Sequence, residues 1–147
     1  MNKILIIDDE IDITESISAI LTDDGFYCTS ASNSEEAIAL LSNELFDLII
    51  LDVWLNDPDY DGIKLLKLIK KKKIKTPVII ISGHGNIEMA VDAIKEGAYE
   101  FIEKPFKSER LTLSVSRALE VKLIRDENKE LKEINFDKNK LIGSSSN

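Results

Sequence analysis

Short apolar runs alternate with amphipathic segments along most of the chain. The runs are four to six residues long and rich in isoleucine, leucine and valine or in aromatic residues, so they predict buried strands. They cover residues 4–7, 26–31, 48–51, 78–81 and 99–102. The segments that follow each run repeat apolar residues at intervals of three and four, as in Ile13, Ile17 and Leu21. Such spacing predicts helices with one buried face.

The order of these elements predicts the fold class. Strands that are apolar throughout are buried on both faces, and strands that alternate with helices pair in parallel through right-handed crossovers. We therefore expect an α/β protein with a doubly wound, five-stranded parallel sheet. Local signals mark the helix limits: Gly25 and Gly97 are expected to end helices, Ser32 with Glu35 predicts a capping box, and Asn86 is a candidate N-cap.

The apolar pattern weakens after Leu119. Residues 120–134 are charged with sparse apolar positions, which predicts that the last helix extends beyond the domain. This extension is either a solvated helix or half of a contact with a second copy, and its heptad pattern is short and interrupted. Residues 135–147 predict a linker. We expect a domain at 1–120 and a helical linker at 121–147.

Composition narrows the functional classes. With 27 acidic and 19 basic residues the net charge is −8, which disfavours binding to nucleic acid or to an acidic membrane surface. The lysines at 70–73 and 75 form a basic run, for which we expect a solvated helix end. Cys28 is the only cysteine, so no disulfide can form within the chain. No run is long enough to span a bilayer and no secretory signal opens the chain, so we expect a cytoplasmic protein.

Polar residues capable of chemistry stand where the predicted strands end. They are Asp8, Asp9 and Glu10 after the first strand, Asp52 after the third, Ser82 after the fourth and Lys104 after the fifth. The carboxyl ends of parallel strands share one edge, which is where doubly wound sheets bind ligands. We therefore expect these side chains to converge.

Grouped carboxylates repel one another and normally require a cation. Hard oxygen donors with room for water and phosphate suit Mg²⁺ better than a transition metal. These residues predict a Mg²⁺ pocket in which Asp9 and Asp52 bind the ion directly and Asp8 binds it through water. Asp52 would be placed to attack a phosphoryl group, with Lys104 and Ser82 donating hydrogen bonds to the phosphoryl oxygens.

The ordered set of motifs resembles the response regulator receiver family. The acidic triplet at 8–10, Asp52, Ser82 and the Lys104-Pro105 pair follow that family's signature over roughly the first 120 residues. The resemblance implies a CheY-like fold and phosphorylation of Asp52 by a sensor histidine kinase in the presence of Mg²⁺. It also implies a signalling rather than an enzymatic role, with self-phosphorylation from small donors and autodephosphorylation at most.

The same resemblance assigns further roles. The backbone carbonyl of Trp54 would be a metal ligand, the Lys104–Pro105 peptide would be cis, and Phe101 would be the aromatic switch that turns inward when Ser82 moves toward the phosphate. His84, the only histidine, lies two residues beyond Ser82. We expect an exposed loop residue there; the alternative hypothesis is that His84 and Trp54 flank the path of the hydrolytic water.

Three segments, at 53–62, 81–86 and 103–107, are similar to the NtrX branch of the NtrC family. In that family the receiver precedes an AAA+ ATPase and a helix-turn-helix, and residues 141–144 resemble the start of the ATPase. The resemblance implies a transcription regulator that contacts DNA only through a C-terminal part outside this sequence. It also implies a homodimer, formed through the fourth helix, fifth strand and fifth helix or through the extension of the last helix.

Three rival functions compete with this one. A phosphatase of the haloacid dehalogenase type needs an acid two residues after its nucleophile, where this chain has Trp54. A flavin or dinucleotide binder needs glycines and free amides after the first strand, where this chain is acidic. A degenerate receiver that signals by protein binding alone is disfavoured by the complete acidic set.

Overall fold

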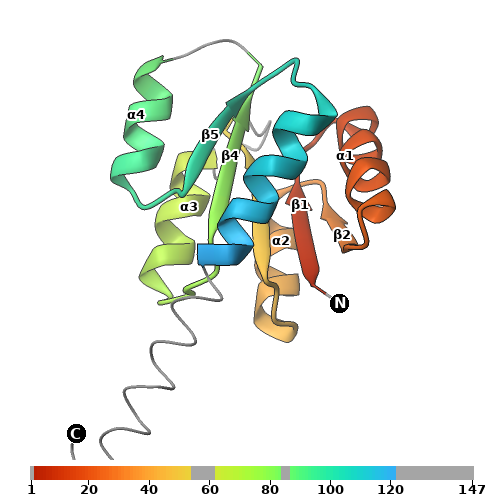
Figure 1. The fold of residues 1–147 in the computed structure, drawn as a ribbon. Helices are drawn as coiled ribbons and strands as arrows, with labels where there is room; N and C mark the ends of the chain where they lie inside the picture. The colour runs from red at the N-terminus through yellow and green to blue at the C-terminus, as the bar shows by residue number, and fades with distance from the viewer. Residues whose placement is uncertain (1, 54–61, 84–86, 122–147) are drawn as a thin grey trace, which may run out of the picture.

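The computed structural model describes residues 2–53, 62–83 and 87–121. Its strands are β1 (Lys3–Ile7), β2 (Tyr27–Ala31), β3 (Leu48–Asp52), β4 (Val78–Ser82) and β5 (Glu100–Glu103). Its helices are α1 (Ile11–Asp23), α2 (Ser34–Asn43), α3 (Gly62–Lys71) and α4 (Ile87–Lys95), followed by a last helix described over residues 108–121. The elements follow the predicted order along the chain (Figure 1).

The five strands pair in parallel in the order β2-β1-β3-β4-β5, which confirms the doubly wound sheet. The chain leaves β1 toward β2 and later returns to the other side of β1 as β3. The crevice outside the carboxyl ends of β1 and β3 is therefore the expected ligand position of this topology. Ile7 pairs with Leu51, so Asp8 and Asp52 come next on neighbouring strands.

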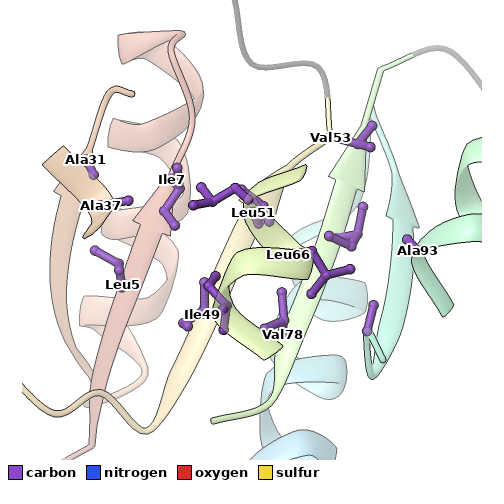
Figure 2. Close-up of a cluster of buried hydrophobic side chains, with 14 of the residues drawn as sticks. Leu5, Ile7, Ala31, Ala37, Ile49, Leu51, Val53, Leu66, Val78 and Ala93 are labelled. Atoms are coloured by element: carbon purple, nitrogen blue, oxygen red, sulfur yellow. The ribbon is translucent and has the colours of Figure 1, made fainter. Parts of the chain in front are cut away.

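Helices cover both faces of the sheet, and each face has its own hydrophobic core. Successive side chains of a strand point to opposite faces. In β1, Leu5 and Ile7 belong to the core beneath α2, α3 and α4, whereas Ile4 and Ile6 belong to the core beneath α1 and the last helix. Figure 2 shows the first of these cores, with Leu66 of α3 packed over the side chains of the strands. The continuous burial of β3 and β4 explains their unbroken apolar sequences.

The start of α2 differs from the predicted capping box by one residue. Asn33, not Ser32, is the N-cap, and its side chain accepts a hydrogen bond of 2.8 Å from the Glu36 backbone N–H. The Glu36 carboxylate, not that of Glu35, reaches back to the backbone N–H and hydroxyl of Ser32, at 3.2 and 2.9 Å. Asn33 has the extended backbone of a cap residue, so the helix begins one residue later than the sequence suggested.

Other local predictions are confirmed with small shifts. Gly25 and Gly97 follow α1 and α4 with φ of +92° and +106°, a backbone region that favours glycine. β3 and β4 each run one residue further than predicted and include Asp52 and Ser82. The candidate N-cap Asn86 lies outside the described residues.

The end of α3 is closed by a lysine in a glycine-like conformation. Lys73 has φ of +61°, its N–H donates to the Lys70 carbonyl, and the Ile74 N–H reaches back to the Ile69 carbonyl at 3.3 Å. This pairing is a Schellman motif, whose left-handed position favours glycine.

We expect Lys73→Gly to raise the free energy of unfolding in urea by about 0.5 to 1 kcal/mol, because the backbone strain of a left-handed lysine is relieved. Lys73→Ala keeps the strain and should change it by less than about 0.5 kcal/mol; equal effects of both variants would contradict this account.

Several predicted features lie outside the described residues. These are Trp54, with the backbone carbonyl expected to bind metal, His84, the greater part of the loop at 53–62, and the helical extension and linker beyond residue 121. Within the described part of the chain, no helix combines the length and apolar character needed to cross a membrane.

Candidate functional site

The ends of β1, β3 and β5 bring two buried carboxylates onto one lysine. The Lys104 Nζ lies 3.0 Å from Asp8 Oδ2, 3.3 Å from Asp52 Oδ2 and 3.9 Å from Glu10 Oε1. The side chains of Asp8 and Asp52 are 0% and 3% exposed, that of Lys104 is 12% exposed and that of Glu10 is 63% exposed. The site is thus a buried charge cluster with an acidic rim. The predicted convergence of Asp8, Asp52 and Lys104 is confirmed.

Three carboxylates are close enough to share one cation. Each of Asp8, Glu10 and Asp52 offers an oxygen within 4.8 Å of the others. Asp8 Oδ1 also accepts a hydrogen bond of 2.9 Å from the Glu10 backbone N–H, which holds the start of the following turn against the site. Of the two expected direct ligands, Asp52 is a member of this set, whereas Asp9 is half-buried and is not. The all-oxygen donor set fits Mg²⁺.

The electrostatics of the cluster show an excess of negative charge. Burial raises the pKa of the Asp8 carboxyl above its ordinary value of 3.8, and the charge of Asp52 adds to this rise against the opposing Glu10 N–H and Lys104 ammonium. Burial alone would lower the pKa of Lys104, but the carboxylates of Asp52 and Asp8 raise it instead. The lysine stays charged, and two buried carboxylates share one ammonium. A divalent cation would relieve this imbalance.

Ser82 ends β4 beside this cluster with its hydroxyl available. The residue is fully buried, and its Oγ has no hydrogen-bond partner among the described parts of the chain. Its backbone carbonyl accepts a bond of 2.6 Å from the Lys104 N–H, which ties the end of β4 to the residue that carries the ammonium. A buried hydroxyl without a partner is unfavourable, so an incoming oxygen acceptor would be stabilised there.

The fifth strand and the turn after it hold two further predicted features. The Lys104–Pro105 peptide is cis, as the family resemblance implied. Phe101 lies on β5 opposite Ile80, is half-buried and packs against the core beneath α2, α3 and α4. Its side chain therefore touches the face that carries α4.

Gly62 is a site residue that the sequence analysis missed. Its N–H donates to the Val53 carbonyl at 3.0 Å, and a Cβ placed on Gly62 would lie 2.4 Å from Val53 Cα and 2.5 Å from the Asp52 carbonyl oxygen. Contacts this short are impossible, so only glycine lets α3 begin against the Asp52–Val53 peptide. The available signal was the Asp61-Gly62 pair ahead of an amphipathic helix, which marks a turn but not a close approach.

Comparisons with known proteins agree with this geometry. The family model for the response regulator receiver domain matches residues 4–116. An NtrX-like response regulator of Rickettsia bellii is 48% identical over 142 residues, which are 97% of this chain and 30% of that protein. The nitrogen assimilation regulatory protein NtrX of Azorhizobium caulinodans is 46% identical over 145 residues, 99% of this chain and 32% of that protein. The chain therefore spans about a third of the length of these curated relatives.

Solved structures show the same resemblance. NtrX from Brucella abortus in complex with ADP is 45% identical, with a TM-score of 0.85 over 88% of this chain and 30% of that one. The separate receiver domain of Brucella abortus NtrX is 49% identical, with a TM-score of 0.77 over 80% of this chain and 98% of that one. The beryllofluoride-activated NtrC4 receiver domain dimer is 44% identical, with a TM-score of 0.76 over 82% of this chain and 98% of that one.

Proposed function

Since this chain belongs to the response regulator receiver domain family, we propose that Asp52 is its phosphoacceptor and that a sensor histidine kinase is the donor. The observation that carries this proposal is the buried cluster of Asp8, Asp52 and Lys104 at the carboxyl edge of the sheet. The cluster lies at the position where doubly wound sheets bind their ligands. There the Lys104 ammonium pairs with the Asp52 carboxylate, which stays at this edge of the sheet.

In the transfer step, an Asp52 oxygen attacks the phosphorus of a phosphohistidine. The new O–P bond forms as the P–N bond breaks, and the imidazole leaves with the electron pair. Lys104, already 3.3 Å from Asp52, would pair its ammonium with a phosphoryl oxygen. The buried Ser82 hydroxyl would donate to another oxygen, which satisfies the group that has no partner among the described residues.

Mg²⁺ fits the carboxylate donors of this site. Asp52 and Asp9 are the proposed direct ligands, with Asp8 acting through water and the Trp54 carbonyl completing the set; the geometry adds Glu10 as a further candidate. When bound, the ion neutralises the charge that spreads over the transferring phosphoryl oxygens. Burial, with the nearby charge of Asp52, raises the pKa of Asp8, and a bound cation would offset both effects.

Phosphorylation would act by biasing a two-state equilibrium. Ser82 and Lys104 both belong to the edge that joins β4 to β5, through the 2.6 Å bond between their backbones. Movement of Ser82 toward the phosphate would let Phe101 turn inward and alter the neighbouring α4. A shift from mostly inactive to mostly active requires about 5.5 kcal/mol of differential stabilisation, within reach of several charge-assisted hydrogen bonds.

The output surface is proposed to be the face of α4, β5 and the last helix. Val91 and Ile94 on α4 and Leu113 on the last helix are large apolar residues exposed on these elements. Arg110 of the last helix reaches Glu100 of β5 at 3.3 Å and crosses the same face. The dimer in the name of the related NtrC4 structure supports a homodimer here, with the extension of the last helix as the other candidate interface.

The remaining assignments follow from the family resemblance. We propose a receiver domain at 1–120 and a helical linker at 121–147 that leads to an AAA+ ATPase and a DNA-binding part outside this sequence. The protein would act in the cytoplasm as a transcription regulator. Its own chemistry would be limited to self-phosphorylation from small donors and autodephosphorylation.

The test is to locate the phosphoryl group. The chain is incubated with acetyl phosphate, with Mg²⁺ or with EDTA, and its intact mass is measured. A single adduct that requires Mg²⁺ is expected. Reduction with borohydride should then convert the modified aspartate to homoserine, which peptide sequencing should find at position 52. A homoserine at another position would reassign the phosphoacceptor, and a lack of any adduct would favour a module that signals without phosphorylation.

A further inference from the structure

A cavity of about 310 Å³ lies between α2 and α3, away from the acidic cluster of Asp8, Asp52 and Lys104. Its walls are aliphatic: Ile38 and Leu41 come from α2, and Leu68, Ile69 and Ile74 come from α3 and its end. Leu41 lies near the end of α2, and Ile74 precedes β4. The cavity therefore opens near the amino ends of the strands, whereas the acidic site lies at their carboxyl ends.

The cavity walls are part of the folded core. Ile69 is fully buried, while Ile38, Leu41, Leu68 and Ile74 are partly buried residues packed against the same core. The Schellman motif at the end of α3 returns Ile74 toward Ile69, through the 3.3 Å bond between their backbones. The site is therefore preformed, and its apolar surface stays partly in contact with solvent. A preformed concavity of this volume with aliphatic walls and a few polar lining residues is typical of a small-molecule site.

A lysine contributes to the lining of this apolar cavity. Lys72 lines it, is exposed, and has no ion pair with any acidic residue in the described part of the chain. The neighbouring lysines of the run at 70–73 and 75 make this end of α3 strongly basic in a chain of net charge −8. Ser42, the other polar lining residue, donates its hydroxyl to the Ile38 carbonyl at 2.9 Å. Lys72 is therefore the cation of the lining.

We propose that this cavity binds a medium-chain aliphatic carboxylate, with its chain between α2 and α3 and its carboxylate on Lys72. One water molecule takes up about 30 Å³ in the liquid. A cavity of about 310 Å³ therefore has room for about ten groups of that size. An eight-carbon acid has that number of heavy atoms. The combination of an aliphatic wall and one border cation selects against neutral chains and against short acids. Neither Asp52 nor the acidic site takes part.

The first experiment titrates octanoate into the 147-residue chain in EDTA, by calorimetry and by amide chemical shifts. Saturable binding is expected, with shifts confined to α2, α3 and residues 72–75. Hexanoate should bind about tenfold more weakly, because two methylenes are lost, and the neutral octanol about fivefold more weakly, because the ion pair is lost. Asp52→Asn should bind octanoate unchanged, which separates this proposal from the function of the acidic site.

Two matched pairs of variants decide the location. Lys72→Gln should weaken octanoate binding about fivefold, whereas Lys71→Gln, in the same basic run but outside the lining, should weaken it less than about twofold. Ser42→Trp should block the cavity and Ser42→Ala should not; Ser42 is exposed, so both variants should fold, which far-UV circular dichroism checks. Equal effects of the two lysine variants would overturn the proposal. So would octanoate failing to bind while an acidic leucine-containing peptide binds, which would indicate a protein partner.

Discussion

Replacing Asp8 with asparagine is expected to abolish most Mg²⁺-dependent phosphorylation while stabilising the metal-free chain. Asparagine keeps the Oδ1 acceptor for the Glu10 N–H but removes one of the two buried negative charges. Asp52 is then the one buried carboxylate that faces Lys104, beside the exposed Glu10 at 3.9 Å, so the buried charges form a balanced pair. With EDTA present, the free energy of unfolding at neutral pH should rise on the order of 1 kcal/mol, since a buried charge with too little compensation is gone. The phosphorylation rate should fall at least about tenfold, because the cation site loses a ligand charge.

The pH dependence of this stabilisation has a definite sign. The pKa of Asp8 is raised in the folded chain, so the unfolded chain loses this proton first as the pH rises. Between the ordinary value of 3.8 and the raised pKa, the unfolded state binds fewer protons than the folded state, and the stability of the wild type falls. The advantage of Asp8→Asn should therefore be absent below this window and complete above it.

Urea unfolding at several pH values in EDTA, together with phosphorylation by acetyl phosphate in Mg²⁺, measures both effects. Asp92→Asn is the matched control, because Asp92 is exposed on α4 and should leave both quantities near their wild-type values. Added Mg²⁺ should stabilise the wild type more than Asp8→Asn. If Asp8→Asn destabilises the metal-free chain at neutral pH, the excess of negative charge inferred for the cluster is wrong.

Gly62→Ala is expected to cost about 2 to 3 kcal/mol of folding free energy and to lower the phosphorylation rate at least about tenfold. The added methyl would meet the Val53 backbone and the Asp52 carbonyl oxygen at 2.4 to 2.8 Å. These are backbone atoms, which cannot turn aside as a flexible side chain would. The start of α3 or the end of β3 must shift, and because Asp52 is the last residue of β3, we expect its carboxylate to move relative to Lys104.

Gly83→Ala provides the control close to the same site. A Cβ on Gly83 would meet the Lys104 side chain at 3.8 Å, an ordinary van der Waals contact. This variant should therefore keep both the urea midpoint and the phosphorylation rate close to those of the wild type. Similar losses in Gly83→Ala and Gly62→Ala would show that any side chain near the site is harmful and would remove the specific role of the Gly62 contact.

The order and type of the elements were predictable from the sequence because they depend on local periodicity. Strands apolar on both faces and helices with one apolar face leave little choice but a covered parallel sheet. The meeting of Asp8, Asp52 and Lys104 was predictable for the same reason, since the carboxyl ends of parallel strands share an edge. The cap of α2 was misplaced by one residue, because Ser32 and Asn33 are both good cap residues and backbone geometry decides between them.

The sequence by itself therefore determined the sheet, its ligand edge and the chemistry gathered there. Only the tertiary structure decided which carboxylates lie within reach of one another, with Glu10 in the close set and Asp9 outside it. It alone revealed the approach of Gly62 to the Asp52–Val53 peptide and the cavity bordered by Lys72. These features depend on distances between segments remote in the chain and on the directions of single side chains. Local pattern constrains neither of them, because both arise only when the helices pack on the sheet.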